Sequence, residues 1–310
     1  MILTNGFIVD APEHLLPSYK ISPFRNVDSY RNKIAKKNNE LNIREYLSHR
    51  FLEKDVLLTS NGRGALGAAL IMLDLKADDV VTIFTTTNSF YISGCVTSEI
   101  EKYCKWSRNI EKNTKVILVN HEFGFCSQEM KKYAALGYPI IEDFAHSFIS
   151  DSVDNDTGYY SDFLVFSFSK YFPIQVGGAL VYNNKFQNSY IEEEKLSSYI
   201  NNVTTNYIKS IPSIKFKKID NYHYYLKLFS GLSLTPYFNL EKNDCPAVFC
   251  FKVPRKVDLN KMKVFLNSNG IESSVLYGES AYFLPCHQNI EKYDIEYIYT
   301  AVKLFLETEL

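Results

Sequence analysis

Short apolar segments alternate with helical patterns along the first part of the chain, and this alternation restricts the fold more than any other feature. Five segments rich in β-branched and other apolar residues predict buried strands, at 80–84, 116–119, 138–141, 163–166 and 178–182. Helical patterns lie between them, for example at 64–73 and at 128–136, where Gly137 follows as an expected C-cap. Such alternation predicts right-handed βαβ units, and hence an α/β fold with a mostly parallel sheet flanked by helices.

The pattern changes after about residue 185. Residues 192–226 are polar and helical in pattern, and they are predicted to join two lobes. A strand at 247–253, a helix at 258–267 closed by Gly270, and a final amphipathic helix predict a small α+β lobe. The apolar face of that last helix comprises Ile295, Ile298, Val302, Phe305 and Leu306. We therefore expect a large domain over residues 1–205, with an N-terminal segment at 1–45, and a small C-terminal domain over 206–310.

The composition excludes several classes of protein. The 310 residues are 46% apolar and 22% charged, and the formal net charge of −1 gives no basic field that would favour nucleic acid or an anionic membrane surface. No apolar run approaches the roughly 20 residues that a membrane-spanning helix needs, and the N-terminus lacks the pattern of a signal peptide. We therefore expect a cytoplasmic protein with six reduced cysteines. Residues such as His121 and His287 are too scattered to predict a metal site.

The residues around Lys170 favour a role in ligand binding or catalysis over a position on the surface. An apolar strand ends at Ser167, and Lys170 follows at once. A tight turn with proline then leads into the next strand at Gly178. Strand ends of α/β folds often bind ligands, and lysine condenses with carbonyl cofactors once desolvation lowers its pKa. The alternative is a plain surface lysine in a turn.

Two carboxylates and a histidine follow the preceding predicted strand. Glu142 and Asp143 come directly after the apolar run at 138–141, and His146 lies three residues beyond Asp143. An enzyme that uses pyridoxal 5′-phosphate (PLP) needs a carboxylate opposite the pyridine nitrogen to keep that nitrogen protonated. Asp143 is placed for this role, and His146 for a hydrogen bond to the phenolic oxygen or for stacking on the ring. The alternative is an acidic pair that caps a turn, with His146 as a core residue.

A third candidate is the turn at Gly62 and Arg63. A strand-like pair of leucines precedes it, and an Ala/Leu-rich helix begins after it. The backbone N–H groups of a helix N-terminus bind phosphate, Gly62 allows close approach of the backbone, and Arg63 adds positive charge. The segment is neither a Walker A loop nor a dinucleotide fingerprint, because the required Lys-Ser/Thr pair and third glycine are missing. A plain N-cap turn is the alternative.

Taken in order, these segments resemble the DegT/DnrJ/EryC1/StrS family of sugar aminotransferases, which are PLP enzymes of fold type I, over about residues 45–305. Residues 60–66 resemble the family's Ser-Asn-Gly-Thr-x-Ala-Leu phosphate turn, and residues 119–124 its Val-x-His-x-x-Gly strand end. Residues 142–146 resemble Glu-Asp-x-Ala-Gln, with His146 in place of glutamine. Residues 166–170, followed by Gly177 and Gly178, resemble Phe-Ser-Phe…Lys…Gly-Gly, and residues 270–271 and 284–288 resemble the small lobe of some members.

The resemblance implies roles by position. Lys170 would hold the cofactor aldehyde as a Schiff base and shuttle protons, and Asp143 would pair with the pyridine nitrogen. Ser167 and the turn at Gly62 and Arg63 would hold the phosphate. The resemblance also implies a homodimer with the active site at the interface.

The family pattern implies one further role, and the sequence departs from that pattern in three ways. Asn221 would reach across the dimer to the partner's phosphate group, as an asparagine in that region does in the family. The chain is shorter than usual members after Gly178. Residues 83–88 replace a stretch that usually supplies an aromatic side chain over the ring, so that Phe90 or Tyr91 is expected there instead. Lys170 follows Ser167 more closely than is common in the family.

The expected function is transfer of an amino group, from glutamate or a similar donor, to a keto-sugar nucleotide in polysaccharide or antibiotic sugar synthesis. A PLP-dependent sugar dehydratase or lyase is the second hypothesis. Family members that dehydrate carry histidine in place of the lysine, so Lys170 favours transamination. A non-catalytic, shortened family member is the third hypothesis, motivated by the missing segment.

Overall fold

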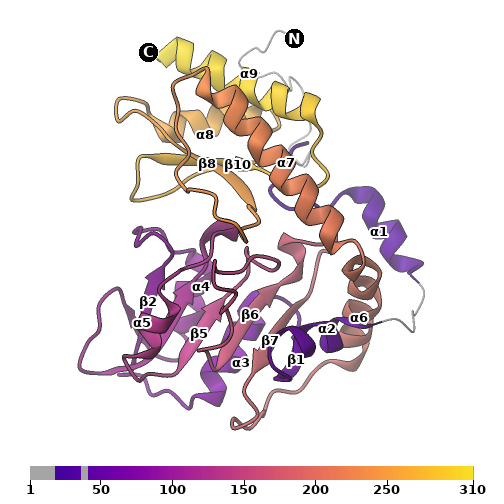
Figure 1. The fold of residues 1–310 in the computed structure, drawn as a ribbon, viewed down its shortest axis with the longest axis vertical. Helices are drawn as coiled ribbons and strands as arrows, with labels where there is room; N and C mark the ends of the chain where they lie inside the picture. The colour runs from indigo at the N-terminus through magenta and orange to yellow at the C-terminus, as the bar shows by residue number, and fades with distance from the viewer. Residues whose placement is uncertain (1–17, 36–40, 310) are drawn as a thin grey trace. The chain divides into compact units, whose positions relative to one another are not determined.

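The computed structural model describes residues 18–35 and 41–309, which form two compact units (Figure 1). The larger unit comprises Phe24–Pro212 and Glu241–Asp244, and the smaller unit comprises the described residues up to Pro23 together with Ser213–Leu240 and Cys245 onward. The expected domain boundary after residue 205 falls inside α6 (Glu194–Ile208) and stays a prediction. Part of the expected N-terminal segment lies outside the described residues.

A seven-stranded sheet forms the centre of the larger unit. Its strands are β1 (Asp55–Thr59), β2 (Val80–Thr85), β3 (Lys105–Ser107), β4 (Thr114–Asn120), β5 (Ile140–Asp143), β6 (Phe163–Ser167) and β7 (Gly178–Tyr182). They are ordered β1-β7-β6-β5-β4-β2-β3, and among these described strands only β7 runs antiparallel to its neighbours. The prediction of a mostly parallel sheet that contains the five apolar segments is therefore confirmed.

Helix α3 (Gly62–Met72) shows how the sequence builds this core. It begins where the Asn61 side chain accepts a hydrogen bond from the Gly64 N–H at 3.0 Å. Residues 65–70 are all buried, as expected for a helix that is apolar on nearly every face. All of them except Gly67 belong to one core cluster with side chains from six of the strands, including Leu57, Ile83, Leu118, Ile141, Val165 and Leu180.

The other helices of the larger unit connect or flank these strands. They are α1 (Asn26–Lys33), α2 (Ile43–Arg50), α4 (Gly94–Ile100), α5 (Met130–Ala134) and α6. The helix predicted at 128–136 is therefore shorter than expected. It ends before Gly137, whose φ of +77° is the left-handed conformation expected just beyond a helix.

The smaller unit has its own antiparallel sheet, ordered β8-β10-β9, and its own helices. Its elements are most of α7 (Ile211–Ser230), then β8 (Val248–Lys252), α8 (Leu259–Ser268), β9 (Ser274–Val275), β10 (Ala281–Pro285) and α9 (Lys292–Glu309). All five residues of the predicted apolar face of α9 are buried, and the predicted strand at 247–253 and helix at 258–267 are present as β8 and α8. Two strands, β9 and β10, lie between α8 and α9. No helix within the described ranges is both long and apolar enough to cross a membrane.

Candidate functional site

The predicted site residues of the larger unit gather at one edge of its sheet. β5 ends at Asp143 and β6 ends at Ser167, and these two strands are parallel neighbours. Lys170 closes a short 3₁₀ helix, η2 (Phe168–Lys170), which follows β6 directly. The carboxyl ends of parallel strands meet at the same edge of a sheet, which is where open α/β sheets bind ligands. The short spacing from Ser167 to Lys170 therefore keeps the lysine close to this edge.

Gly62 and Ser167 meet although they are far apart in the sequence. A Cβ atom added at Gly62 would lie 3.2 Å from Cβ of Ser167 and 3.7 Å from its Oγ. Glycine thus lets the Ser167 hydroxyl approach the first turn of α3, whose N-terminal N–H groups have no partner within the helix. Arg63 lies in this first turn with its side chain exposed. A hydroxyl, a charged side chain and a helix N-terminus at one place form an arrangement that binds phosphate.

Asp143 is a buried acid beside a lysine. Its side chain accepts a hydrogen bond from the Ala145 N–H at 2.8 Å, and the residue is only 7% exposed. Burial raises the pKa of Asp143, while the Ala145 N–H and positive charge at His121 and Lys170 lower it. Lys170 is thus near enough for its charge to act on Asp143. A carboxyl group in this environment favours a cationic partner, and a protonated pyridine nitrogen is one.

His121 and Glu142 form a buried pair that the sequence did not predict. The Ser127 N–H donates to Nδ1 of His121 at 3.1 Å, so the ring proton lies on Nε2. Nε2 donates to Oε2 of Glu142 at 2.7 Å, and both side chains are fully buried. The pair fastens the end of β4 to the end of β5, directly beside Asp143.

A chain of aromatic rings leads to His146. The rings of Tyr91 and Phe123 stack with centroids 5.8 Å apart, and the rings of Phe123 and His146 lie 5.1 Å apart. Of the two aromatic residues expected near the cofactor ring, Tyr91 belongs to this chain, whereas Phe90 is 77% exposed. Tyr91 is therefore the better candidate for the wall of the site.

Asn221 lies in the smaller unit, on α7, and is fully buried. Its Nδ2 donates to the carbonyl oxygens of His287 at 3.0 Å and of Ile290 at 2.9 Å. These contacts join α7 to the segment before α9, so they give Asn221 a packing role. Its expected contact with a partner's phosphate group stays a prediction.

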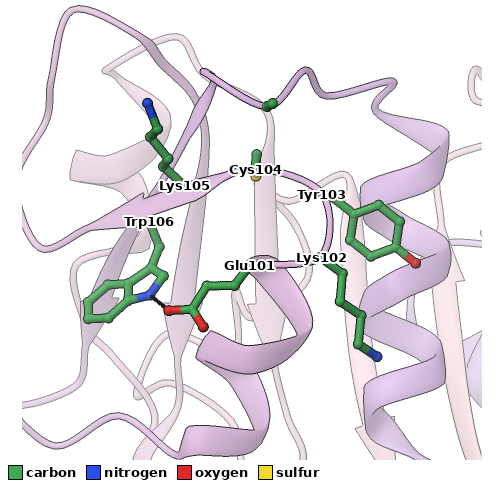
Figure 2. A pocket seen from close by; sticks show the side chains of 7 residues that line it. Glu101, Lys102, Tyr103, Cys104, Lys105 and Trp106 are labelled. Atoms are coloured by element: carbon green, nitrogen blue, oxygen red, sulfur yellow. Dashed lines mark hydrogen bonds between the residues drawn. The ribbon is translucent and has the colours of Figure 1, made fainter.

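A hollow of about 440 Å³ lies elsewhere in the larger unit and is lined by Ala77 and residues 101–106 (Figure 2). Trp106 and Glu101 face each other there, and the indole Nε1 donates to Oε1 of Glu101 at 2.9 Å. Because Lys105 pairs with Val80, the first residue of β2, this hollow lies at the amino-terminal ends of the strands. It is thus on the opposite edge of the sheet from Lys170. Within residues 18–35 and 41–309, no group of three or more His, Cys, Asp or Glu side chains is arranged to hold a metal ion.

Several solved structures share this fold. The PLP form of Spr1654 from Streptococcus pneumoniae superposes with a TM-score of 0.70 at 14% identity, covering 96% of this chain and 100% of that one. The aminotransferase TlmJ from Streptoalloteichus hindustanus gives 0.69 at 14% identity, with 85% and 89% covered. NtdA from Bacillus subtilis, with bound PMP, gives 0.62 at 18% identity, with 84% and 76% covered.

Sequence comparison identifies the family. A search of curated protein sequences finds no match. The model of the DegT/DnrJ/EryC1/StrS aminotransferase family, however, matches residues 32–211, which is more than half of the chain and includes the whole edge from Gly62 to Lys170. This match confirms the resemblance on which the sequence predictions relied. The chain therefore belongs to the DegT/DnrJ/EryC1/StrS aminotransferase family.

Proposed function

We propose that this protein is a PLP-dependent aminotransferase that moves an amino group from glutamate, or a similar amino acid, to a keto-sugar nucleotide for polysaccharide or antibiotic sugar synthesis. The proposal depends on one observation: Lys170, Asp143 and the contact between Gly62 and Ser167 all lie at the same edge of the sheet. Family membership supports the reaction type. The cofactor-bound neighbours, Spr1654 with PLP and NtdA with PMP, support the cofactor.

The residues at this edge fit the chemical groups of PLP. The phosphate group would meet the first-turn N–H groups of α3, the Ser167 hydroxyl and Arg63. The pyridine nitrogen would meet Asp143, where a positive charge lowers a carboxyl pKa that burial has raised. The aldehyde would meet Lys170, the lysine that acts electrostatically on Asp143. His146 would contact the ring, with Phe123 and Tyr91 packed behind it.

The chemistry divides between the cofactor and the protein. Bound PLP supplies an electron sink for the negative charge that develops on the substrate carbon. Asp143 keeps a proton on the ring nitrogen, because its carboxylate stabilises the protonated form. Lys170 would hold the cofactor between turnovers; once released, its Nζ would accept the proton that leaves the carbon of the amino donor in the first half-reaction and would give a proton to the carbon of the acceptor in the second. The helix N-terminus and Ser167 keep the cofactor in place during these steps.

Borohydride trapping tests the assignment of Lys170. Reduction of the PLP-loaded protein is expected to attach the cofactor to the peptide that contains Lys170, as read by peptide mass spectrometry. Lys170→Ala should lose this adduct and the visible absorbance. Lys185→Ala is the matched control, because Lys185 pairs with Asp162 and has an exposed side chain. Attachment at another lysine, or unchanged absorbance in Lys170→Ala, would contradict the proposal.

The donor and the acceptor need separate experiments. Glutamate alone should remove the visible absorbance of the PLP form in a half-reaction, which a dehydratase would not show. A panel of keto-sugar nucleotides should then restore that absorbance, and the acceptor that does so fastest identifies the substrate. We also propose a homodimer, as the family resemblance implies, and a cytoplasmic location, as expected from the sequence. Sedimentation equilibrium of the PLP-loaded protein tests the dimer.

A further inference from the structure

Glu122 is a buried acid that binds one short loop at three points. The residue is only 2% exposed. Its Oε2 accepts hydrogen bonds from the N–H of Thr87 at 2.8 Å and from the Thr87 hydroxyl at 2.9 Å. Its Oε1 accepts a hydrogen bond from the Ser89 hydroxyl at 2.7 Å. Thr87 and Ser89 belong to the loop at 86–91, which follows β2 at the carboxyl edge of the sheet.

Arg108 holds the same loop from a second direction. Its Nη2 donates to the carbonyl oxygen of Ser89 at 2.9 Å. Burial raises the pKa of Glu122, and the Ser89 and Thr87 donors, together with Arg108, lower it. Three donors and one cation thus compensate the burial of this carboxylate, as a buried charge requires.

The backbone between the two anchored residues is in an uncommon conformation. Asn88 lies between Thr87 and Ser89 and has a φ of +57°. A left-handed conformation is unfavourable for a residue other than glycine, although asparagine tolerates it better than most. The contacts to Glu122 on both sides maintain this turn, so the loop has a defined course instead of several.

The loop ends at Tyr91, whose ring is linked to His146 through Phe123. Tyr91 stacks on Phe123, the residue directly after Glu122, and Phe123 contacts His146. Phe84, the aromatic residue before the loop, stacks instead on Tyr133 with centroids 4.5 Å apart. Glu122 therefore holds the loop that carries Tyr91 and also precedes the ring against which Tyr91 packs.

We propose that Glu122 is a positioning residue of the active site, which fixes the loop at 86–91 so that Tyr91 stacks on Phe123 beside His146 and completes the wall of the cofactor site. The proposal rests on the proposed function for the identity of the cofactor. Glu122 acts through Tyr91 and touches neither cofactor nor substrate. Its effect on cofactor binding should therefore disappear when the ring of Tyr91 is absent.

The test is a double-mutant cycle read by PLP binding. Glu122→Gln keeps the shape of the side chain but replaces one carboxylate oxygen with an NH₂ group. This group can only donate, so the hydrogen bonds that the replaced oxygen accepted are lost. Glu122→Gln and Tyr91→Leu should each weaken PLP binding roughly two- to tenfold, the range for loss of one aromatic contact. The double variant should bind PLP no more weakly than Tyr91→Leu. The circular dichroism of the visible cofactor band should change in the same way in all three.

Three controls separate this role from general stability. Tyr91→Phe keeps the ring and should bind PLP like the wild type. Glu129→Gln removes an exposed acid that pairs with Lys132, and it should have no effect. If Glu122→Gln fails to fold, Ser89→Ala removes one donor to the same carboxylate and is used in the same cycle with Tyr91→Leu.

Each other outcome overturns the proposal. Wild-type PLP affinity in Glu122→Gln would show that the carboxylate does not position the wall. Losses that multiply in the double variant would show that Glu122 does not act through Tyr91. Either result, with the cofactor still trapped on Lys170 in the wild type, leaves the proposed function intact. A wild-type protein that binds no PLP would overturn both.

Discussion

Gly178 is the position where the smallest substitution should disturb the site most. It begins β7, opposite Thr59 of β1 and Ser167 of β6. A Cβ atom there would lie 2.6 Å from the carbonyl carbon of Asn61, 2.6 Å from the carbonyl oxygen of Phe166 and 2.7 Å from that of Asn61. These are backbone atoms, so no side-chain rotation relieves the contact. Gly178→Ala therefore forces the turn before α3 away from the end of β6.

The size of the effect follows from these distances. The closest contact is about 0.8 Å shorter than the 3.4 Å at which ordinary van der Waals contact begins. Gly178 does not have a positive φ, so alanine is compatible with its backbone and the cost is steric. An added methyl group that forces a backbone shift lowers the free energy of unfolding by about 1–3 kcal/mol. Loss of one hydrogen bond to the phosphate would in addition weaken PLP binding about tenfold.

Urea denaturation of the cofactor-free protein and PLP titration measure the two effects. Gly94→Ala is the control, because no heavy atom of the described residues comes within 4 Å of a Cβ there. This control should change stability by less than about 0.5 kcal/mol. Wild-type stability and PLP affinity in Gly178→Ala would refute the argument that the close approach of β7 shapes the turn before α3. Equal losses in both variants would refute it as well.

Three further predictions concern ionisable groups. Burial raises the pKa of Asp143 in the native state above its ordinary value of 3.8, so the native state without cofactor binds this proton more tightly than the unfolded state. The cofactor-free protein therefore loses stability as the pH rises from the ordinary pKa to the raised native pKa. Asp143→Asn should therefore raise the unfolding midpoint of the cofactor-free protein at about pH 7 and lose this advantage at about pH 4; an advantage independent of pH would contradict the assignment. Glu142→Gln, which impairs the buried contact with His121, should lower the free energy of unfolding by about 1–3 kcal/mol in urea titrations, and an unchanged midpoint would count against the pair. All six cysteines lie in the described residues, and Cys95 alone is exposed, so a thiol reagent should modify one cysteine rapidly in the native protein and six after denaturation; a second fast thiol would contradict the burial of the rest.

Local patterns predicted most of the large sheet. Parallel strands are buried on both faces and so read as continuous apolar runs, which is why β4 and β6 were found within one or two residues. β3 was not predicted, because it is a three-residue edge strand, Lys-Trp-Ser, without an apolar run. The antiparallel direction of β7 was not predicted either, since the same apolar residues suit both directions.

The residues of the candidate site were also predicted only in part. Lys170, Asp143 and Ser167 were predicted because each follows or ends an apolar strand. The pairing of His121 with Glu142 was not, because its partners are 21 residues apart and each is an ordinary polar residue in the sequence. The three contacts of Glu122 with Thr87 and Ser89 were missed for the same reason.

The sequence by itself determined most of the order of strands and helices, the glycines of the turn before α3 and the placement of Lys170 at a strand end. These are local properties, set by apolar periodicity and by residue types within a few positions of one another. Only the tertiary structure decided which distant groups meet: Gly62 with Ser167, Glu122 with the loop at 86–91, and Asn221 with carbonyl groups near α9. Such contacts depend on strand register and chain direction, and a buried polar side chain bonds to the partner that packing brings within reach.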